Sequence, residues 1–472
     1  MRRGEARPRS QGVVSWALWD WGSAAFNAVV TTFVFTVYLT SSAFGDANTT
    51  SAALGAGMAV AGAAIALVAP VVGQSADRSG RTTFWLGVNS VILTVLMLAL
   101  YFVRPDPAYL WLGVALVAVG NVVFEFASVN YNALLPVVAR PENIGRVSAL
   151  GWGAGYLGGI VLLLILVIGF INPQVGWFGV TPADGENVRV GMVLSAVWFA
   201  VAAVPVLVRV RDRRPVHGDG ENDSGDDAYG SVPADDGSPP LPAPPAAKKL
   251  GVVGAYKALW QTIRGLARTS PRTLGFLIAS AVFRDGLAGV FTFGGIIAAG
   301  TFGFTPGQVI VFGIAANVVA GVITIASGSL DDRLGPKAVI VASLSIMIVA
   351  GLGLFFLRDL GPTAFWVLGL ALAAFVGPAQ SASRTFLARV IPAGREGEIF
   401  GLYATTGRAV SFLAPMAFST AIAIGASVTG GQAQYFGILG IVLVLALGLA
   451  LLLLVPARPP ALDAAGETHR TA

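Results

Sequence analysis

The chain has 472 residues, of which 55% are hydrophobic and 12% are charged, about half the charged fraction of a soluble globular protein. This composition excludes an ordinary soluble protein and indicates an integral membrane protein. The absence of cysteine excludes disulfides, thiol nucleophiles and thiolate metal sites. Because the two histidines, His217 and His469, lie outside the apolar segments, an intramembrane histidine relay or metal site is excluded as well.

Apolar stretches long enough to cross a bilayer recur along the chain, since a transmembrane helix needs roughly 20 mostly apolar residues. Several connections between them are very short, such as that from Arg104 to Pro107, and a short connection makes neighbouring helices antiparallel. The sequence predicts an all-α membrane protein without a cleaved signal peptide. The twelve predicted spans are 13–43, 52–74, 83–103, 108–134, 148–171, 189–209, 273–301, 307–329, 338–357, 363–388, 398–424 and 434–456.

Basic residues are distributed unevenly between the spans. With a cytoplasmic N-terminus, the outer loops hold only Arg104, Arg189 and Arg358, and the inner segments hold a large excess of Lys and Arg. Because cytoplasmic loops are enriched in these residues, we expect both termini in the cytoplasm. Contact of the basic loops with anionic lipid accounts for the net charge of +5, so no nucleic-acid partner is expected.

A polar segment divides the chain. Residues 212–247 are rich in Asp, Gly, Ser and Pro, and such a segment cannot bury enough apolar area to fold, so we expect a disordered cytoplasmic linker. Residues 248–270 gather apolar side chains on one helical face, which predicts an amphipathic helix on the inner membrane surface or a plain juxtamembrane helix. The remaining domains are a six-helix half at 1–211, a second at 271–457 and a cytoplasmic tail at 458–472.

The two halves share a Gly-x-x-x-Asp-Arg-x-Gly motif, which begins at Gly73 and again at Gly328. The first Gly lets two helices approach, the last permits the positive φ of a tight turn, and the Asp can bond a neighbouring helix N-terminus. Two copies at equivalent places indicate a parallel repeat of six plus six helices, the plan of major facilitator transporters. In those transporters this motif latches the cytoplasmic gate. The resemblance implies that role for Gly73, Asp77, Arg78, Gly80, Arg81, Gly328, Asp332, Arg333, Gly335 and Lys337.

Ionisable residues inside the predicted spans are candidates for the transport pathway, because a charge within a membrane is costly and usually functional. By position in the spans, Glu125, Arg284, Asp285 and Arg408 lie near the midplane. The other two ionisable residues, Asp20 and Arg384, lie nearer the cytoplasm. The candidate substrate and proton pathway comprises Asp20, Asn27, Glu125, Arg284, Asp285, Gln380, Arg384 and Arg408.

Several of these residues can be interpreted as functional or as structural. Glu125 is either a proton carrier or substrate contact, or one partner of a structural ion pair with an arginine. Arg408 is interpreted as binding an anionic group such as a carboxylate. Arg284 and Asp285 are adjacent, so they point to different faces and one of them can bind a neighbouring helix. For Asn130 and Asn132 we favour hydrogen bonds that pack helices.

Several blocks of sequence resemble the vacuole-effluxer-like, autophagy-related family of major facilitator transporters. Trp19 and Ser23 depart from the Tyr and Asn that are usual in its first block. The resemblance implies the major facilitator fold and export of small solutes, which are taken to be amino acids in the fungal members. The blocks are Trp16–Asn27, Tyr131–Pro136, Gly155–Gly159, Gly377–Arg384, Phe400–Tyr403, Gly407–Arg408 and Ser411–Pro415.

These features predict a secondary active transporter that exports a small solute, an amino acid or similar, by alternating access. Glu125 or Asp20 would take up a proton in a proton-coupled transporter, but a uniporter would have the same sequence features. We expect a monomer in a bacterial plasma membrane, with no cofactor, metal or catalytic residue, and no direct use of ATP because a Walker-type loop is missing. The alternative is a non-transporting membrane scaffold or sensor, against which the costly midplane charges argue.

Overall fold

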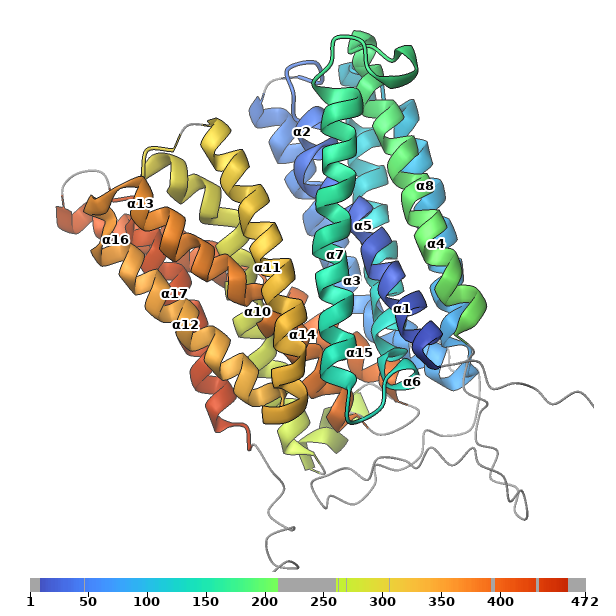
Figure 1. The fold of residues 1–472 in the computed structure, drawn as a ribbon, viewed down its shortest axis with the longest axis vertical. Helices are drawn as coiled ribbons and strands as arrows, with labels where there is room; N and C mark the ends of the chain where they lie inside the picture. Colours follow the sequence, from blue (N-terminus) through green and yellow to red (C-terminus); the bar gives the residue numbers. More distant parts are fainter. Residues whose placement is uncertain are drawn as a thin grey trace, which may run out of the picture.

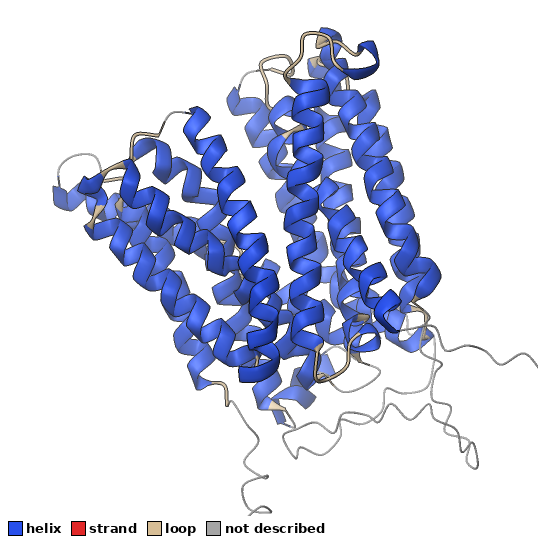
Figure 2. Ribbon diagram, viewed as in Figure 1, coloured by secondary structure: helices blue, strands red, loops and turns tan. Residues whose placement is uncertain are grey.

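A computed structural model describes residues 9–45, 47–210, 260–261, 263–268, 270–304, 306–391, 395–429 and 433–456. Within these ranges every regular element is a helix (Figure 2). The predicted linker at 212–247, the tail at 458–472 and most of the predicted amphipathic helix lie outside the described residues. Of that helix, residues 260–261 and 263–268 are helical, with Trp260 exposed and Leu266 buried.

The N-terminal half, residues 9–210, contains the first six apolar spans. The first span bends, because its α-helix passes into a π-helix and then kinks at Val34, where φ is −118°. The main elements are α1 (Arg9–Ala24), η1 (Ala25–Phe33), α2 (Phe35–Leu39), α3 (Ala47–Ser79), α4 (Thr82–Ala99), α5 (Leu110–Ala133), α6 (Leu135–Val138), α7 (Ile144–Leu166), η4 (Val167–Ile171) and α8 (Glu186–Arg209).

The C-terminal half, residues 270–456, repeats the arrangement. Its elements are α10 (Pro271–Gly300), α11 (Pro306–Leu334), α12 (Pro336–Phe356), η7 (Arg358–Leu360), α13 (Pro362–Ala364), η8 (Phe365–Gly369), α14 (Leu370–Val390), α15 (Glu396–Ala409), α16 (Leu413–Thr429) and α17 (Phe436–Leu454). In the described residues, eleven helical stretches are long and apolar enough to cross a membrane. The predicted second span adds α3, whose described apolar part is Ala53–Ala69.

The predicted eleventh span, 398–424, is not one continuous helix. α15 ends at Ala409, a turn follows, and α16 begins at Leu413. Pro415 lies in the first turn of α16, where its missing N–H is tolerated, but its ring would clash with the carbonyl of residue 411 in a continuous helix. Turn hydrogen bonds satisfy part of the break, since the Leu413 N–H donates to the Val410 carbonyl over 3.0 Å. The remaining free N–H groups at the start of α16 can be bonded by side chains.

The two halves meet most extensively along two helix pairs from distant parts of the sequence, and further contacts join α7 to α14 and α5 to α15. α3 packs against α15, and α7 packs against α11. Figure 1 shows the halves close together near the end that carries α6 and the start of α1, and diverging toward the other end. The first and last described residues also lie at the end where the halves are close together (Figure 1).

Glycines at equivalent places in the repeat permit this approach. A Cβ at Gly73 on α3 would overlap the carbonyl oxygen of Gly397 on α15. A Cβ at Gly328 on α11 would lie 2.7 Å from the Cβ of Ala149 on α7. The prediction that the first Gly of each motif lets helices approach is confirmed, and each copy packs against the opposite half.

Candidate functional site

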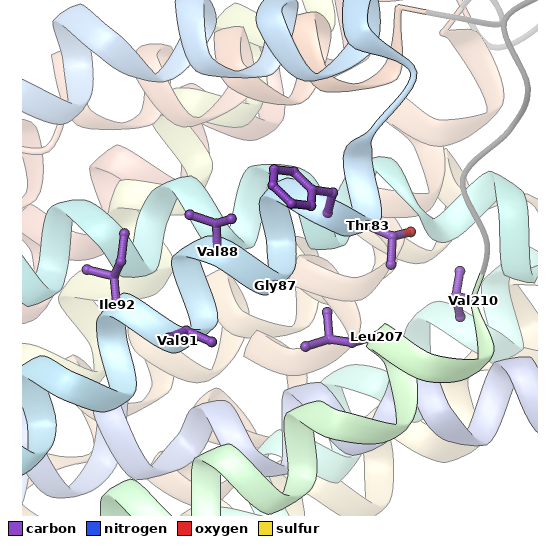
Figure 3. A pocket seen from close by; sticks show the side chains of 8 residues that line it. Thr83, Gly87, Val88, Val91, Ile92, Leu207 and Val210 are labelled. Atoms are coloured by element: carbon purple, nitrogen blue, oxygen red, sulfur yellow. The ribbon is translucent and has the colours of Figure 1, made fainter.

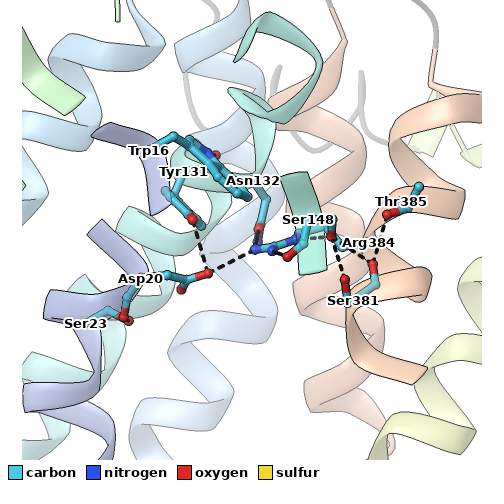
Figure 4. A network of polar contacts seen from close by, with 9 residues as sticks. All are labelled: Trp16, Asp20, Ser23, Tyr131, Asn132, Ser148, Ser381, Arg384 and Thr385. Carbon is cyan, nitrogen blue, oxygen red and sulfur yellow. Dashed lines mark hydrogen bonds and ion pairs between the residues drawn. The ribbon is translucent and has the colours of Figure 1, made fainter. Parts of the chain in front are cut away.

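Arg384 on α14 joins the two halves through a buried polar network (Figure 4). Its Nη1 lies 3.4 Å from Oδ2 of Asp20 on α1 and 3.2 Å from Oδ1 of Asn132 on α5. It also donates to Ser148 on α7, over 3.1 Å to the hydroxyl and 2.6 Å to the backbone carbonyl. Three helices of the N-terminal half therefore hold one arginine of the C-terminal half, whose side chain is only 5% exposed.

Aromatic rings cover the same guanidinium. Trp16 and Tyr131 are stacked with centroids 4.4 Å apart, and the Arg384 Cζ lies 4.8 Å from the centroid of Trp16. A cation over an aromatic face is attracted by the ring quadrupole. The Tyr131 hydroxyl donates to Oδ2 of Asp20 over 3.1 Å, so the aromatic cluster also positions the carboxylate. The bulky residues of the first and second sequence blocks thus support the ion pair.

A second ion pair crosses the halves between α5 and α15. Nη2 of Arg408 donates to Oε2 of Glu125 over 3.0 Å. The side chains are 32% and 18% exposed, respectively, so the pair is only partly shielded from solvent. A nearby hydrogen bond from the Thr405 hydroxyl to the Ala66 carbonyl, 3.1 Å long, ties α15 to α3. Of the two readings of Glu125, the ion pair with an arginine is present, and it joins the two halves.

Arg284 and Asp285 on α10 point to different neighbours, as their adjacency predicts. Oδ2 of Asp285 accepts a 2.6 Å hydrogen bond from the backbone N–H of Ala414, so the buried carboxylate caps the broken end of α16. The Arg284 guanidinium lies 3.8 Å from the ring centroid of Tyr403 and donates to the Tyr403 carbonyl over 3.1 Å. Neither contact crosses between the halves.

Arg284 differs from the other two membrane arginines in its charge balance. Within the described ranges, Arg384 and Arg408 each form an ion pair with a carboxylate, whereas no ion pair involves Arg284. Its Nε is buried and makes no hydrogen bond to any described residue. A cation without an anion inside a membrane is costly and marks a candidate contact for an anionic group.

The second copy of the repeated motif makes contacts between the two halves. The carboxylate of Asp332 at the end of α11 accepts from the backbone N–H of Gly145 over 2.7 Å and of Arg146 over 3.2 Å. These are orphan donors at the N-terminus of α7. Arg389 on α14 lies 3.4 Å from the same carboxylate. The predicted contact between the motif Asp and a neighbouring helix N-terminus is therefore present.

The turns that close the two motif copies have the expected backbone conformation, whereas Lys337 bonds a carbonyl of its own half. Gly80 and Gly335 have φ of +60° and +85°, as expected of the closing glycine. The motif is mostly helical, because α3 and α11 run to Ser79 and Leu334. Lys337 donates to the carbonyl of Val455, so it caps α17 within its own half and does not join the halves.

Other motif residues contribute less to the description. Arg81 is the N-cap of α4, and both Arg81 and Arg333 are exposed. The side chains of Asp77 and Arg78 lie outside the described set. Equivalent close packing at Gly73 nevertheless places the first copy beside the start of α15.

Of the uncharged candidates, Gln380 is partly buried one turn before Arg384. Asn27 is exposed on η1, and its carbonyl accepts the hydroxyls of Thr31 and Thr32, each over 2.7 Å. Asn132 bonds an arginine of the other half, so it does more than pack helices. Ser148 was missed by sequence reasoning, because one hydroxyl at the expected edge of a span carries no distinctive pattern.

A groove of about 670 Å³ runs along the outside of the N-terminal half between α4 and α8 (Figure 3). Its lining is apolar apart from Thr83, and it includes the exposed side chains of Phe84 and Val91. None of the candidate pathway residues lines it. Apolar, exposed helix faces are what lipid requires, so this groove is separate from the charged site.

The chain is similar to known proteins over most of its length. The profile of a family described as "Vacuole effluxer Atg22 like" matches residues 36–460. An uncharacterized MFS-type transporter of Bacillus subtilis, YxiO, is 24% identical over 448 residues, which cover 94% of each chain. Autophagy-related protein 22-2 of Aspergillus clavatus is 26% identical over 291 residues, which cover 57% of this chain and 42% of the fungal protein.

Solved structures share the fold at low sequence identity. The major facilitator transporter FucP in the outward conformation aligns with a TM-score of 0.61 at 13% identity, over 96% of this chain and 99% of that one. The proton:xylose symporter XylE bound to 6-bromo-6-deoxy-D-glucose aligns with a TM-score of 0.66 at 12% identity, over 95% of each chain. The chain is thus an all-helical, multi-pass membrane protein and not an enzyme, and it belongs to the vacuole effluxer Atg22-like family of major facilitator superfamily transporters.

Proposed function

We propose that this transporter exports a small solute, an amino acid or a similar molecule, as a secondary active transporter with alternating access. The observation that carries the proposal is the pair of carboxylate–arginine contacts between the halves, Asp20–Arg384 and Glu125–Arg408. Both must break before the halves can separate at this end. Charged contacts that form in one state and break in the other are suited to a gate, because they make the two packed states distinct.

The solute is proposed to bind at the unpaired arginine. Arg284 offers a guanidinium with a buried, unbonded Nε, and guanidinium geometry matches a carboxylate. The sequence reading assigned anion binding to Arg408, but Arg408 is bonded to Glu125. Arg284 is therefore the better first contact, and Arg408 becomes available only after its ion pair opens. A zwitterion could separate that pair by giving its carboxylate to Arg408 and its ammonium to Glu125.

Protons remain candidate coupling ions. Protonation of Glu125 or Asp20 would remove the charge that holds an arginine of the other half, so proton uptake would favour separation at this end. The same contacts also serve a uniporter in which the solute alone breaks them. The pH dependence of flux distinguishes these two mechanisms.

The gate is proposed to lie on the cytoplasmic side, with both termini, in a bacterial plasma membrane. Loop basic residues support the orientation, and the bacterial relative that matches 94% of the chain supports the location. The protein is proposed to work as a monomer without a cofactor.

A flux assay tests the proposal directly. Purified protein in proteoliposomes is supplied with labelled amino acids, dipeptides or sugars, with and without a pH gradient. Movement of an amino acid or dipeptide supports the transporter, and failure to move any of these solutes favours the scaffold or sensor. Glu125→Gln should abolish the pH dependence if Glu125 carries the proton, whereas unchanged pH dependence removes it from that role. Glu186→Gln, at the start of α8, is the matched control.

A further inference from the structure

A cavity in the C-terminal half has a composition unlike that of the charged site. It has a volume of about 180 Å³ and lies among α10, α11, α12, α14 and α17. Asn317 is the only polar side chain among its described lining residues, and its amide donates to the Gly313 carbonyl over 2.8 Å. That bond uses one of the two N–H groups of the amide, and the rest of the described lining is apolar. An apolar cavity of about 150 Å³ stays dry and binds benzene, so the lining favours an apolar group.

The cavity is bordered by both halves. Phe33, at the end of η1 in the N-terminal half, lines it together with Phe291 of α10. These two side chains are 52% and 41% exposed. The Phe291 ring also lies 6.5 Å from that of Tyr156 on α7, so this part of α10 faces the N-terminal half. A solute that lies between the halves would meet the cavity beside these two rings.

The unpaired arginine lies on the same face of α10. Seven residues separate Arg284 from Phe291, which is two helical turns and an axial distance of about 10.5 Å. A guanidinium that forms no ion pair within the described residues and an apolar cavity thus lie along one line on one helix. Glycines leave room within the cavity, since a Cβ at Gly294 or Gly313 would meet no heavy atom within 4 Å.

We infer that the cavity is a binding site for the apolar end of an elongated solute whose anionic end binds Arg284. The chemical class is a carboxylate with an aliphatic or aromatic group of at most phenyl size, placed about 10 Å from the carboxylate. A dipeptide with an apolar first residue meets this description better than a small amino acid such as alanine. The inference rests on the proposed transport function and adds the shape of the solute.

Filling the cavity tests the inference. Gly313→Leu places a side chain in the open space, whereas Gly55→Leu on α3 is a matched control, because a Cβ there also meets nothing within 4 Å and Gly55 does not line the cavity. Proteoliposome flux is measured with labelled alanine, glycyl-glycine, leucyl-glycine and phenylalanyl-glycine. We expect wild type to favour the two apolar dipeptides. Gly313→Leu should reduce that preference roughly 10- to 100-fold, the discrimination that a hydrophobic pocket provides.

The outcomes separate the two proposals. If wild type moves none of these solutes nor any other amino acid or sugar, the transport function fails and the inference with it. If wild type transports solutes but prefers alanine or glycyl-glycine, or if Gly313→Leu lowers all four fluxes equally, the cavity is not a solute site and transport stands. A Gly313→Leu protein that fails to fold is replaced by Gly294→Ala or Gly313→Ala, for which a smaller loss of the same preference is expected.

Discussion

The ion pair between Asp20 and Arg384 makes a quantitative prediction about the gate. Asp20→Asn removes the negative charge and leaves Arg384 bonded to Asn132 and Ser148. Removing one partner of a buried pair costs about 3–5 kcal/mol, and a hydrogen bond to a charged group contributes about 1.5–3 kcal/mol. The Asp20 side chain is 18% exposed, and Asn keeps a hydrogen-bond acceptor. We therefore expect Asp20→Asn to weaken the contact between the halves by about 2–3 kcal/mol, close to the value of one hydrogen bond to a charged group.

That cost falls only on the state in which the halves meet at this end. Once they separate, water hydrates Arg384 and the substitution changes little. The equilibrium should therefore shift toward separation roughly 30- to 140-fold, at tenfold per 1.4 kcal/mol. A population that is small in the wild type becomes measurable in Asp20→Asn.

Distances between spin labels measure this shift. The chain contains no cysteine, so Ser79→Cys and Leu334→Cys introduce the only thiols. Both positions are exposed, and they lie directly before the turns at Gly80 and Gly335 in the two halves. We expect double electron–electron resonance to show longer distances in Asp20→Asn than in the wild-type background. Asp359→Asn is the control, because that side chain is 87% exposed.

An unchanged distance distribution together with unchanged flux would refute the reasoning that this pair holds the halves together. Asp20→Glu keeps the charge and should keep the wild-type distribution, so it separates loss of charge from loss of packing. If Asp20→Asn and Asp20→Glu shift the distribution equally, the exact placement of the carboxylate against Arg384, and not the charge alone, determines the equilibrium.

Two further predictions concern packing between helices. Gly73→Ala should lower the thermal unfolding midpoint and lengthen the same label distance, because its Cβ would overlap the Gly397 carbonyl. Gly62→Ala is the control and should change neither quantity, because a Cβ there meets nothing within 4 Å. Equal behaviour of the two variants would contradict the close approach of α3 and α15. Asp285→Ala should destabilise the protein by about 0.5–2 kcal/mol through loss of the helix cap, and Asp285→Asn should destabilise it less. If Asp285→Ala unfolds in detergent at the same temperature as the wild type, the cap is dispensable.

The fold was accessible from the sequence because bilayer physics restricts it strongly. Every backbone polar group in lipid must be bonded within the segment, so long apolar stretches must be helices. The predicted spans accordingly match the observed helices, and the repeat at Gly73 and Gly328 predicted close contacts that are present. The break at 410–412 was missed, because hydropathy does not change across it and the first-turn position of Pro415 becomes apparent only once the helices are placed.

The sequence predicted which residues belong to the candidate site but not how they contact one another. The cost of a membrane charge identified Asp20, Glu125, Arg284 and Arg384 from the sequence alone. Pairing was not accessible, because partners such as Asp20 and Arg384 are 364 residues apart and no local pattern connects them. The structure transferred the candidate anion contact from Arg408 to Arg284 by showing which arginine has a carboxylate beside it.

Composition, span lengths and the duplicated motif therefore determined the class, the approximate number of membrane helices and the positions that carry charge, since these depend on local chain chemistry and on the lipid solvent. The tertiary structure decided which of the described charges neutralise one another, at which end the halves are in contact, and that an apolar cavity lies along the same helix as Arg284. These properties depend on how helices from two halves meet, and that packing brings together residues whose separation in the chain carries no information about their contact.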